Sequence, residues 1–188
     1  MHGRVISMKI LVMMANGFEE IEALSVVDVA RRAGIETVMV SVSEEYYVDS
    51  ARNVRVKADK LLKDITVEKE DMIVIPGGQG VEVLEKSGEL AELLKKHRSY
   101  SGRVAAICAG PSIPGELGLL RGIKAVCYPG YEQYLEGAQV AYDDVAVDSN
   151  FITSRGPGTA LAFSYAIVGE ILGYDVADKL KKDMLYKN

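Results

Sequence analysis

The sequence has only two histidines and two cysteines, and both shortages restrict its chemistry. His2 is near the N-terminus, and His97 is in KKHRSY at the end of a predicted helix, where we expect it to face solvent. Neither histidine follows a predicted strand, so we expect no Cys-His catalytic pair, no metal site and no other cofactor. Cys108 and Cys127 form no CxxC motif and no disulfide framework, which favours a reducing, cytoplasmic environment.

Excess positive charge and long apolar runs are also lacking. The 188 residues include 22 Lys and Arg against 27 Asp and Glu, a net charge of −5. This balance gives no electrostatic reason to bind nucleic acid or an anionic membrane, and no apolar run approaches the roughly 20 residues that span a bilayer. We expect residues 1–188 to form one domain. Met8 is a candidate start, which would make residues 1–7 a short extension, and MKILVMMA is expected to be a strand, not part of a signal peptide.

Apolar strands alternate with helices along the chain. Strands are expected at 8–15, 36–42, 54–58, 71–76, 103–108 and 123–128, with a paired-strand region at 140–153. Helices are expected at 19–33, 81–98, 111–119, 158–173 and 175–185. This alternation predicts an α/β fold with a mostly parallel central sheet and helices on both faces.

Three loops share one form, in which an apolar strand ends in small residues before a helix: MMANGFEE, VIPGGQG and AICAGP. Since the carboxyl ends of parallel strands lie at one edge of a sheet, we expect the loops to converge on one crevice. Glycine is common in such turns, so each loop alone is weak evidence. Their conjunction with a cysteine and a carboxylate strengthens the prediction of a site.

Glu22 is the carboxylate of interest because it shares a helix stripe with Val26, Val29 and Ala33. That stripe should face inward, and a partly buried carboxylate tends to stay protonated or to share a proton with a neighbour. The alternative is a structural glutamate whose hydrogen bonds are satisfied.

Cys108 lies at a tight strand-to-helix turn that resembles a nucleophile elbow. Pro111 suits the first turn of a helix, whose N-terminus would lower the pKa of the thiol. Backbone N–H groups after Cys108 and in the PGG loop could form an oxyanion hole. The alternative is a small buried hydrophobic side chain, which is our interpretation of Cys127 within its predicted strand. SRGPGT, at 154–159, lacks the residue order of a phosphate-binding loop and is expected to form a turn at one pocket wall.

Six segments together resemble the ThiJ/PfpI superfamily, in particular the branch of the Parkinson-disease-associated protein deglycase and its bacterial relatives: NGFEEIEA, VDVARRAG, SARNV, IPGG, AAICAGP and TSRGPGT. They occur in family order over nearly the whole chain. The resemblance implies a flavodoxin-like (class I glutamine amidotransferase-like) sandwich and a homodimer. It also implies that small carbonyl compounds or glycated proteins are the substrates.

The resemblance also assigns roles to particular residues. It implies that Cys108 is the reactive cysteine, that Glu22 hydrogen-bonds to it, and that Gly78 and Ala109 supply backbone donors. It implies that Arg52 reaches toward the pocket, often across the dimer. The remaining pocket residues that we predict are Gly77, Tyr128, Gly156 and Pro157.

Two positions depart from the family pattern. Ala109 stands where the peptidase branch has a histidine, and Tyr128 stands where the deglycase branch has one. Tyrosine, with a pKa of about 10, is a poor base at neutral pH but can donate a hydrogen bond. Protease and amidotransferase activities are therefore disfavoured. We expect a glyoxalase- or deglycase-like enzyme with Cys108 as nucleophile and Glu22 as acid/base, or alternatively an oxidative-stress sensor or chaperone whose Cys108 is oxidised to sulfinate.

Overall fold

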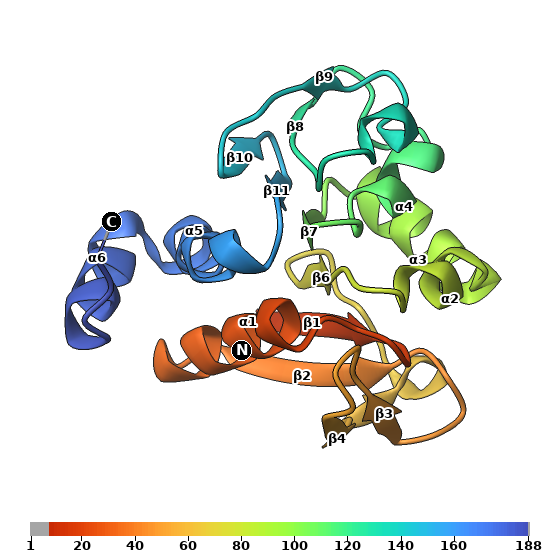
Figure 1. Ribbon diagram of the computed structural model, residues 1–188, viewed down its shortest axis with the longest axis horizontal. Coiled ribbons are helices and arrows are strands. Elements are labelled where there is room, and N and C mark those ends of the chain that lie inside the picture. The colour runs from red at the N-terminus through yellow and green to blue at the C-terminus, as the bar shows by residue number, and fades with distance from the viewer. Residues whose placement is uncertain (1–7, 188) are drawn as a thin grey trace, which may run out of the picture.

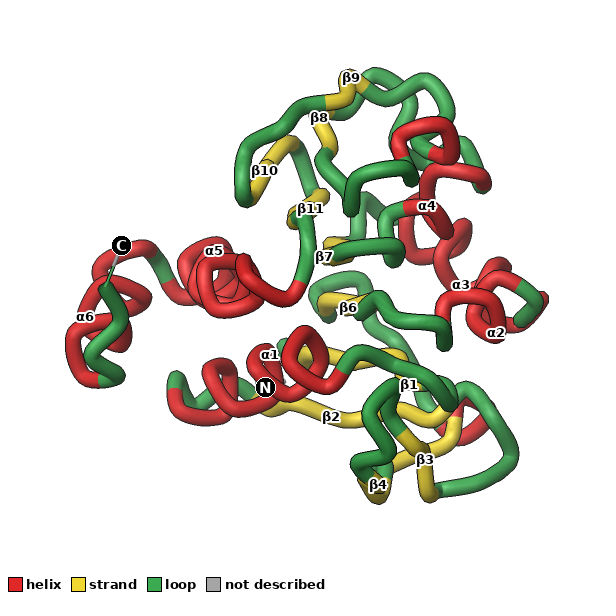
Figure 2. Tube along the Cα trace, viewed as in Figure 1, coloured by secondary structure: helices red, strands yellow, loops and turns green. Residues whose placement is uncertain are grey.

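The computed structural model describes residues 8–187, so His2 and the proposed extension at residues 1–7 lie outside the described residues. Figures 1 and 2 show the arrangement of the elements. The strands are β1 (Lys9–Met14), β2 (Glu36–Ser41), β3 (Tyr47–Asp49), β4 (Arg55–Lys57), β5 (Lys60–Leu61), β6 (Met72–Ile75), β7 (Arg103–Ile107), β8 (Lys124–Ala125), β9 (Gln139–Val140), β10 (Val145–Asp148) and β11 (Phe151–Ser154). The α-helices are α1 (Glu20–Arg32), α2 (Val81–Glu85), α3 (Gly88–Ser99), α4 (Ser112–Glu116), α5 (Ala160–Leu172) and α6 (Tyr174–Asp183). Short 3-10 turns are η1 (Leu62–Asp64), η2 (Glu132–Tyr134) and η3 (Pro157–Thr159).

A seven-stranded central sheet organises the chain, in the order β10-β11-β7-β6-β1-β2-β5. Every neighbouring pair is parallel except β10 and β11, which form the antiparallel pair expected near 140–153. The predicted α/β fold with a mostly parallel sheet is therefore confirmed. Two small sheets, β3-β4 and β8-β9, lie outside it.

Helices cover both faces of the sheet, with α1, α5 and α6 on one side and α2, α3 and α4 on the other (Figure 1). The position of β1 in the middle of the fold explains why its sequence is continuously apolar. Ile10, Val12 and Met14 pack in the core beneath α1 and α5, whereas Leu11 and Met13 pack in the core beneath α2 and α3. Side chains alternate across a strand, so a strand that is covered on both faces needs apolar residues at every position.

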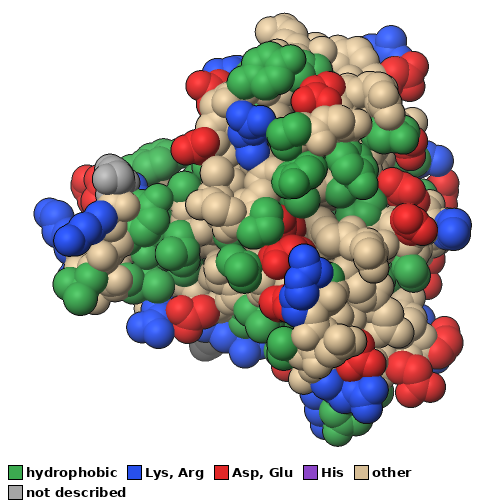
Figure 3. Space-filling model, in the orientation of Figure 1, with side chains coloured by type: hydrophobic (Ala, Val, Ile, Leu, Met, Phe, Trp, Pro, Cys, Tyr) green, Lys and Arg blue, Asp and Glu red, His purple; other side chains and the backbone are tan. Residues whose placement is uncertain are grey.

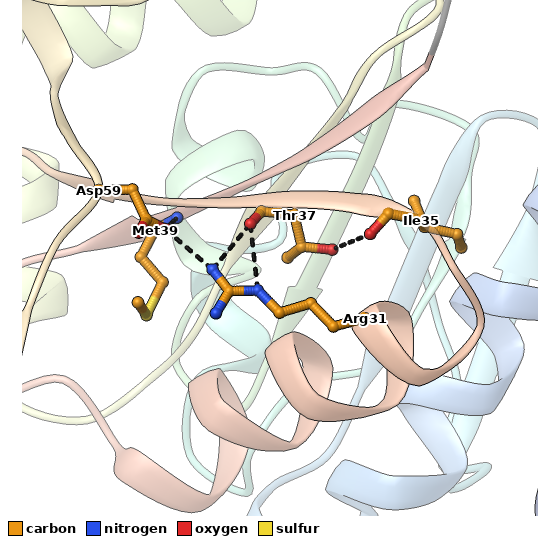
Figure 4. Close-up of polar contacts among 5 residues, drawn as sticks. All are labelled: Arg31, Ile35, Thr37, Met39 and Asp59. Atoms are coloured by element: carbon orange, nitrogen blue, oxygen red, sulfur yellow. Dashed lines mark hydrogen bonds and ion pairs between the residues drawn. The ribbon is translucent and has the colours of Figure 1, made fainter.

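The C-terminal end of α1 is held against β2 by Arg31 (Figure 4). Its Nη2 donates to the Thr37 carbonyl oxygen at 2.9 Å and to Asp59 Oδ2 at 3.0 Å. Asp59 also accepts from the Met39 backbone N–H at 2.8 Å. A cation in the last turn of a helix is also favoured by the helix dipole. This anchor fixes the direction of α1, whose first turn then carries Glu22 to the carboxyl ends of the strands.

Two expected elements differ in the structure. The helix predicted at 81–98 divides into α2 and α3, because the Ser87 side chain accepts from the Leu90 backbone N–H at 3.2 Å and caps a new helix. The strand predicted at 123–128 is reduced to β8, which pairs with β9 and not with the central sheet. Beyond it, the Val126 N–H donates to the Thr153 hydroxyl, so Cys127 is buried but lies outside a strand.

Among residues 8–187, every helix is too short or too polar to cross a bilayer.

Candidate active site

Cys108 occupies a sharp turn directly after β7. Its φ of 65° lies in the left-handed region that side chains other than glycine seldom adopt. Two backbone hydrogen bonds hold it there: the Cys108 N–H donates to the Ser154 carbonyl at 3.0 Å, and the Tyr128 N–H donates to the Cys108 carbonyl at 2.9 Å. A strained turn that neighbouring segments fix in this way is the geometry of a nucleophile elbow.

Glu22 lies in the first turn of α1 and is fully buried. Glu19 caps this helix by accepting from the Glu22 backbone N–H at 2.8 Å. The Glu22 Oε2 atom accepts from the Gly77 backbone N–H at 2.7 Å, whereas its Oε1 atom has no hydrogen-bond partner among residues 8–187. Burial raises the pKa of Glu22 to about 7, although the Gly77 N–H acts to lower it. Near neutral pH this carboxyl group can therefore both donate and accept a proton.

Gly77 is the point at which the thiol and the carboxyl group meet. A Cβ atom at this position would lie 2.6 Å from Cys108 Cβ, 2.8 Å from Glu22 Oε2 and 3.0 Å from Cys108 Sγ. The sulfur and the carboxylate oxygen are thus both within 3.0 Å of one point. Only glycine leaves room for this approach, which explains the small residue that precedes Gly78 in the loop after β6.

The thiol does not have the lowered pKa that the sequence suggested. Burial, the charge of Glu22 and the hydrogen bond with Glu22 raise the pKa of Cys108 to about 12. The N–H groups of Ala109 and Gly78 act in the opposite direction and lower it. The expectation relied on a helix N-terminus at Cys108, but α4 begins only at Ser112 and is five residues long. Burial and the facing Glu22 carboxyl group therefore outweigh the donors that would favour a thiolate at Cys108.

Cys108 opens into a cavity of about 650 Å³ at the carboxyl ends of the strands. The wall is formed by Glu19, Ala51, Arg52, Gly78, Gln79, Val81, Glu82, Glu85, Cys108, Ala109, Glu116, Tyr128, Tyr131 and Tyr134. The cavity therefore brings together four predicted residues, Arg52, Gly78, Ala109 and Tyr128, from loops far apart in the sequence. Arg52 reaches it within the same chain.

Gly156 and Pro157 do not line this cavity, contrary to our expectation. They line a separate hollow of about 250 Å³, which shares only Tyr128 with the larger cavity. Gly156 packs against the Tyr128 ring, because a Cβ atom on Gly156 would lie 3.2 Å from Tyr128 Cδ2. Gly77 is also absent from the wall and lies behind Cys108.

The prediction that His97 faces solvent is wrong. The side chain is only 3% exposed, and its Nε2 lies 3.2 Å from the Arg103 carbonyl oxygen at the amino end of β7. Leu90, Leu94 and His97 are the buried residues of α3, so the histidine follows the helix's apolar stripe. It is at the edge of the sheet opposite to Cys108. Over residues 8–187, no group of three or more His, Cys, Asp or Glu side chains is placed to hold a metal ion.

Comparison with known proteins places this site in a family. The family model described as DJ-1/PfpI matches residues 8–170, which include Glu22, Gly77, Cys108 and Tyr128. The chain belongs to the DJ-1/PfpI family. The ThiJ/PfpI resemblance that the sequence motifs indicated is therefore confirmed.

Several members of the DJ-1/PfpI family are similar over most of the chain. The protein DJ-1 homolog B of Arabidopsis thaliana is 38% identical over 90% of the chain, which spans only 39% of that relative's length. A glutathione-independent glyoxalase of Caenorhabditis elegans is 34% identical over 88% of the chain and 89% of its own length. A deglycase of Pyrococcus abyssi is 30% identical over 83% of the chain and 95% of its own length. The oxidised DJ-1 of Toxoplasma gondii is 36% identical, with a TM-score of 0.91 over 96% of the chain and 100% of its own.

Sequence reasoning missed part of the cavity wall: Glu82, Glu85, Glu116, Tyr131 and Tyr134. The sequence contained a signal for most of them. Two glutamates follow the PGGQG loop directly, and two tyrosines follow Tyr128 at short spacing in YPGYEQY. Residues just after a loop at the site-forming edge of the sheet are candidates for its wall.

Proposed function

We propose that the protein acts on reactive dicarbonyls or their adducts, with Cys108 as nucleophile and Glu22 as acid/base. The observation that supports this most strongly is the buried Glu22 carboxyl group beside the Cys108 sulfur, with a pKa of about 7. A group whose pKa lies near the working pH is the most effective proton carrier. The glyoxalase and deglycase names of two relatives support the same class of reaction.

The first step forms a hemithioacetal. The Cys108 sulfur bonds to the aldehyde carbon while its S–H proton passes to the Glu22 carboxylate. The carbonyl electron pair moves to oxygen, and the N–H groups of Gly78 and Ala109 would stabilise that oxygen; their hydrogen bonds with the Cys108 sulfur support this role. Glu22 then returns the proton to that oxygen. This route needs no free thiolate, which suits a thiol whose pKa is raised by burial.

The second step moves one proton between the two carbons of the dicarbonyl. Glu22 removes the proton from the carbon bonded to sulfur and returns it to the neighbouring carbon, which leaves a thioester. Water then releases a 2-hydroxy acid and restores the Cys108 thiol. One dicarbonyl and one water give one acid, so no external oxidant or reductant is required. Tyr128, in the cavity wall, is suited to donate a hydrogen bond to the second carbonyl oxygen.

The test is methylglyoxal consumption by the wild-type protein and by three variants. We expect Cys108→Ser and Glu22→Gln to lose turnover, and Cys127→Ser, which alters the other buried thiol, to retain it. Absence of turnover in the wild-type protein would overturn the enzymatic proposal.

A second function, peroxide sensing, has its own supporting observation. Cys108 is half-buried and lines the cavity, whereas Cys127 is buried and does not. Two equivalents of peroxide would each transfer one oxygen atom to Cys108 and leave as water, giving a sulfinate. Protonated Glu22 could donate a hydrogen bond to it from its unpartnered oxygen. Mass spectrometry after dilute peroxide should find two added oxygen atoms on Cys108 alone; equal oxidation of Cys127 would count against a sensor.

The homodimer implied by the family resemblance stays a prediction. Sedimentation equilibrium of the full chain would check it.

A further inference from the structure

The charge of the cavity wall is unbalanced. The wall contains one guanidinium group, that of Arg52, and four carboxylates, those of Glu19, Glu82, Glu85 and Glu116. Within residues 8–187 none of these four carboxylates forms an ion pair, whereas acids elsewhere do, such as Asp71 with Lys9. Figure 3 shows acidic and hydrophobic side chains next to one another on the side of the molecule where α2 and α4 lie. A concave site lined by one sign of charge focuses the potential and attracts the opposite charge.

The carboxylates of the cavity wall come from more than one element. Glu82 and Glu85 lie on α2, and Glu116 lies at the end of α4. The buried Ser112 hydroxyl donates to Glu85 Oε1 at 3.0 Å, which orients that carboxylate without neutralising it. The negative charge of Glu85 is therefore held at the cavity wall, and Glu82 and Glu116 add their charges from exposed positions.

Aromatic side chains complete the same wall. Tyr128, Tyr131 and Tyr134 line the cavity, and the rings of the last two are 5.7 Å apart at 49°. The faces of tyrosine rings attract cations, and carboxylates placed beside them add to the attraction. Carboxylates together with several tyrosines form the kind of surface that recognises an ammonium or guanidinium group.

The cavity also has room for more than a small dicarbonyl. Its volume of about 650 Å³ is within the range of pockets that hold drug-sized ligands. A separate observation indicates where the reacting end lies. Cys108 is in the wall, and beside it is the carboxyl group of the fully buried Glu22, whose Oε1 atom has no hydrogen-bond partner among residues 8–187. The remaining space, toward the glutamates and tyrosines, is available to a second part of the same molecule.

We propose that this cavity selects carbonyl compounds that carry a positive charge, as an amine or guanidinium group, and discriminates against anionic carbonyl compounds such as 2-oxo acids. The proposal rests on the proposed carbonyl chemistry and specifies its substrate class. Glu82, Glu85 and Glu116 are the specificity-determining side chains, and the three tyrosines contact the cation.

The first experiment measures the charge preference without requiring turnover. Cationic (trimethylammonioethyl), neutral (methyl) and anionic (sulfonatoethyl) methanethiosulfonates react with a cysteine by the same step. A disulfide forms, the reagent's S–S bond breaks and methanesulfinate leaves. With Cys127→Ser protein, we expect the cationic reagent to modify Cys108 at least about tenfold faster than the anionic one at low salt, relative to their rates with a free thiol. The preference should shrink severalfold in 0.5 M salt, roughly as screening requires.

Variants identify the source of the preference. We expect the triple variant Glu82→Gln, Glu85→Gln and Glu116→Gln to lose most of it, with the neutral reagent unaffected. Glu89→Gln, an exposed glutamate of α3 outside the cavity wall, is the matched control and should leave it unchanged. If the triple variant does not fold, each single variant should reduce the preference about twofold. A rate ratio near one in the wild-type protein, or a ratio unchanged by these substitutions, overturns the proposal.

The second experiment compares three aldehydes as competitors of methylglyoxal consumption: cationic betaine aldehyde, its neutral isostere 3,3-dimethylbutanal, and the smaller, anionic glyoxylate. The cationic compound should compete best and glyoxylate worst. If methylglyoxal is not consumed at all, the proposed enzymatic function fails while the reagent rates still decide the charge preference. If turnover is found and glyoxylate competes as well as betaine aldehyde, the substrate class proposed here is wrong.

Discussion

The central sheet has one edge at the amino ends of its strands and one at the carboxyl ends. His97 is buried at the first edge and Glu22 at the second, but the surroundings of the two side chains differ. At the amino ends of the strands, His97 contacts the Arg103 carbonyl, and nearby Asp71 pairs with Lys9 Nζ at 3.0 Å and accepts from backbone N–H groups. At the carboxyl ends, Glu22 keeps one oxygen without a partner and lies beside a strained cysteine. A buried polar group without a partner costs stability, so an arrangement that retains one is suited to a ligand or a reaction.

Both groups are also packed against a glycine that their neighbours require. A Cβ atom at Gly77 would collide with Glu22 and Cys108, and one at Gly102 would lie 2.3 Å from the His97 ring. The same steric device therefore supports a reactive pair at one edge and a packed, partnered histidine at the other. Close packing and an adjoining hollow occur at both edges, since His97 also lines a space of about 280 Å³. The carboxyl edge is distinguished by the Glu22 oxygen that has no hydrogen-bond partner among residues 8–187 and by the strained cysteine beside it.

The largest expected effect separates the two edges by activity. Glu22→Gln should lower methylglyoxal turnover by about 100- to 10,000-fold, because it removes the proton carrier beside Cys108. His97→Asn should leave turnover per folded molecule nearly unchanged, since it lies at the opposite edge of the sheet. Steady-state kinetics, corrected for folded fraction by circular dichroism, measure both. Equal losses in the two variants would remove the functional distinction between the edges.

The second comparison is the pH dependence of stability, which has opposite signs at the two edges. The pKa of Glu22 is raised in the folded state, so its contribution is complete below pH 4.5 and is lost as the pH rises through about 7. The loss should amount to about 3 kcal/mol relative to Glu22→Gln. The pKa of His97 is lowered by burial, so its contribution is present above its unfolded pKa of 6.5 and is lost as the pH falls through the folded value. Urea unfolding between pH 4 and 8 tests both; a Glu22→Gln curve parallel to the wild-type curve would contradict the burial argument.

Substitutions of the two glycines test the same comparison with a smaller expected effect on activity. Gly77→Ala and Gly102→Ala should each lower the free energy of unfolding by about 1–3 kcal/mol, because a methyl group must displace packed atoms. Only Gly77→Ala should also reduce turnover and slow alkylation of Cys108 in the molecules that remain folded. Retention of full activity by Gly77→Ala would show that the thiol and the carboxyl group need not be so close.

The smallest expected effect concerns Tyr128. Tyr128→Phe should reduce turnover by at most about tenfold, which corresponds to the free energy of one hydrogen bond. The free energy of unfolding should change little, because the ring is 46% exposed. Restoring the family's histidine by Tyr128→His should maintain or increase the rate. The ratio of the two rates at pH 7 shows whether a hydrogen-bond donor at this position is sufficient or a base is needed.

Sequence by itself determined the framework of this protein. Continuously apolar strands alternate with helices, and this pattern predicts a parallel sheet with helices on both faces. The loops after β1, β6 and β7 follow the carboxyl ends of their strands, so they meet at one edge of that sheet. The stripe of Val26 and Val29 placed Glu22 on the inward side of α1. These features depend on local periodicity and on chain direction, which can be read directly from the order of residues.

Tertiary structure alone decided the state of the site. Burial and Glu22, 86 positions away in the sequence, raise the pKa of Cys108 by more than the Ala109 N–H of its own turn lowers it, which is the opposite of the expected direction. Gly156 and Pro157 line a separate hollow that shares only Tyr128 with the cavity, which the order of residues does not reveal. The acidic wall and the burial of His97 likewise arise from elements that meet only when folded. Desolvation and electrostatic interactions depend on distances in space, and a linear sequence does not contain them.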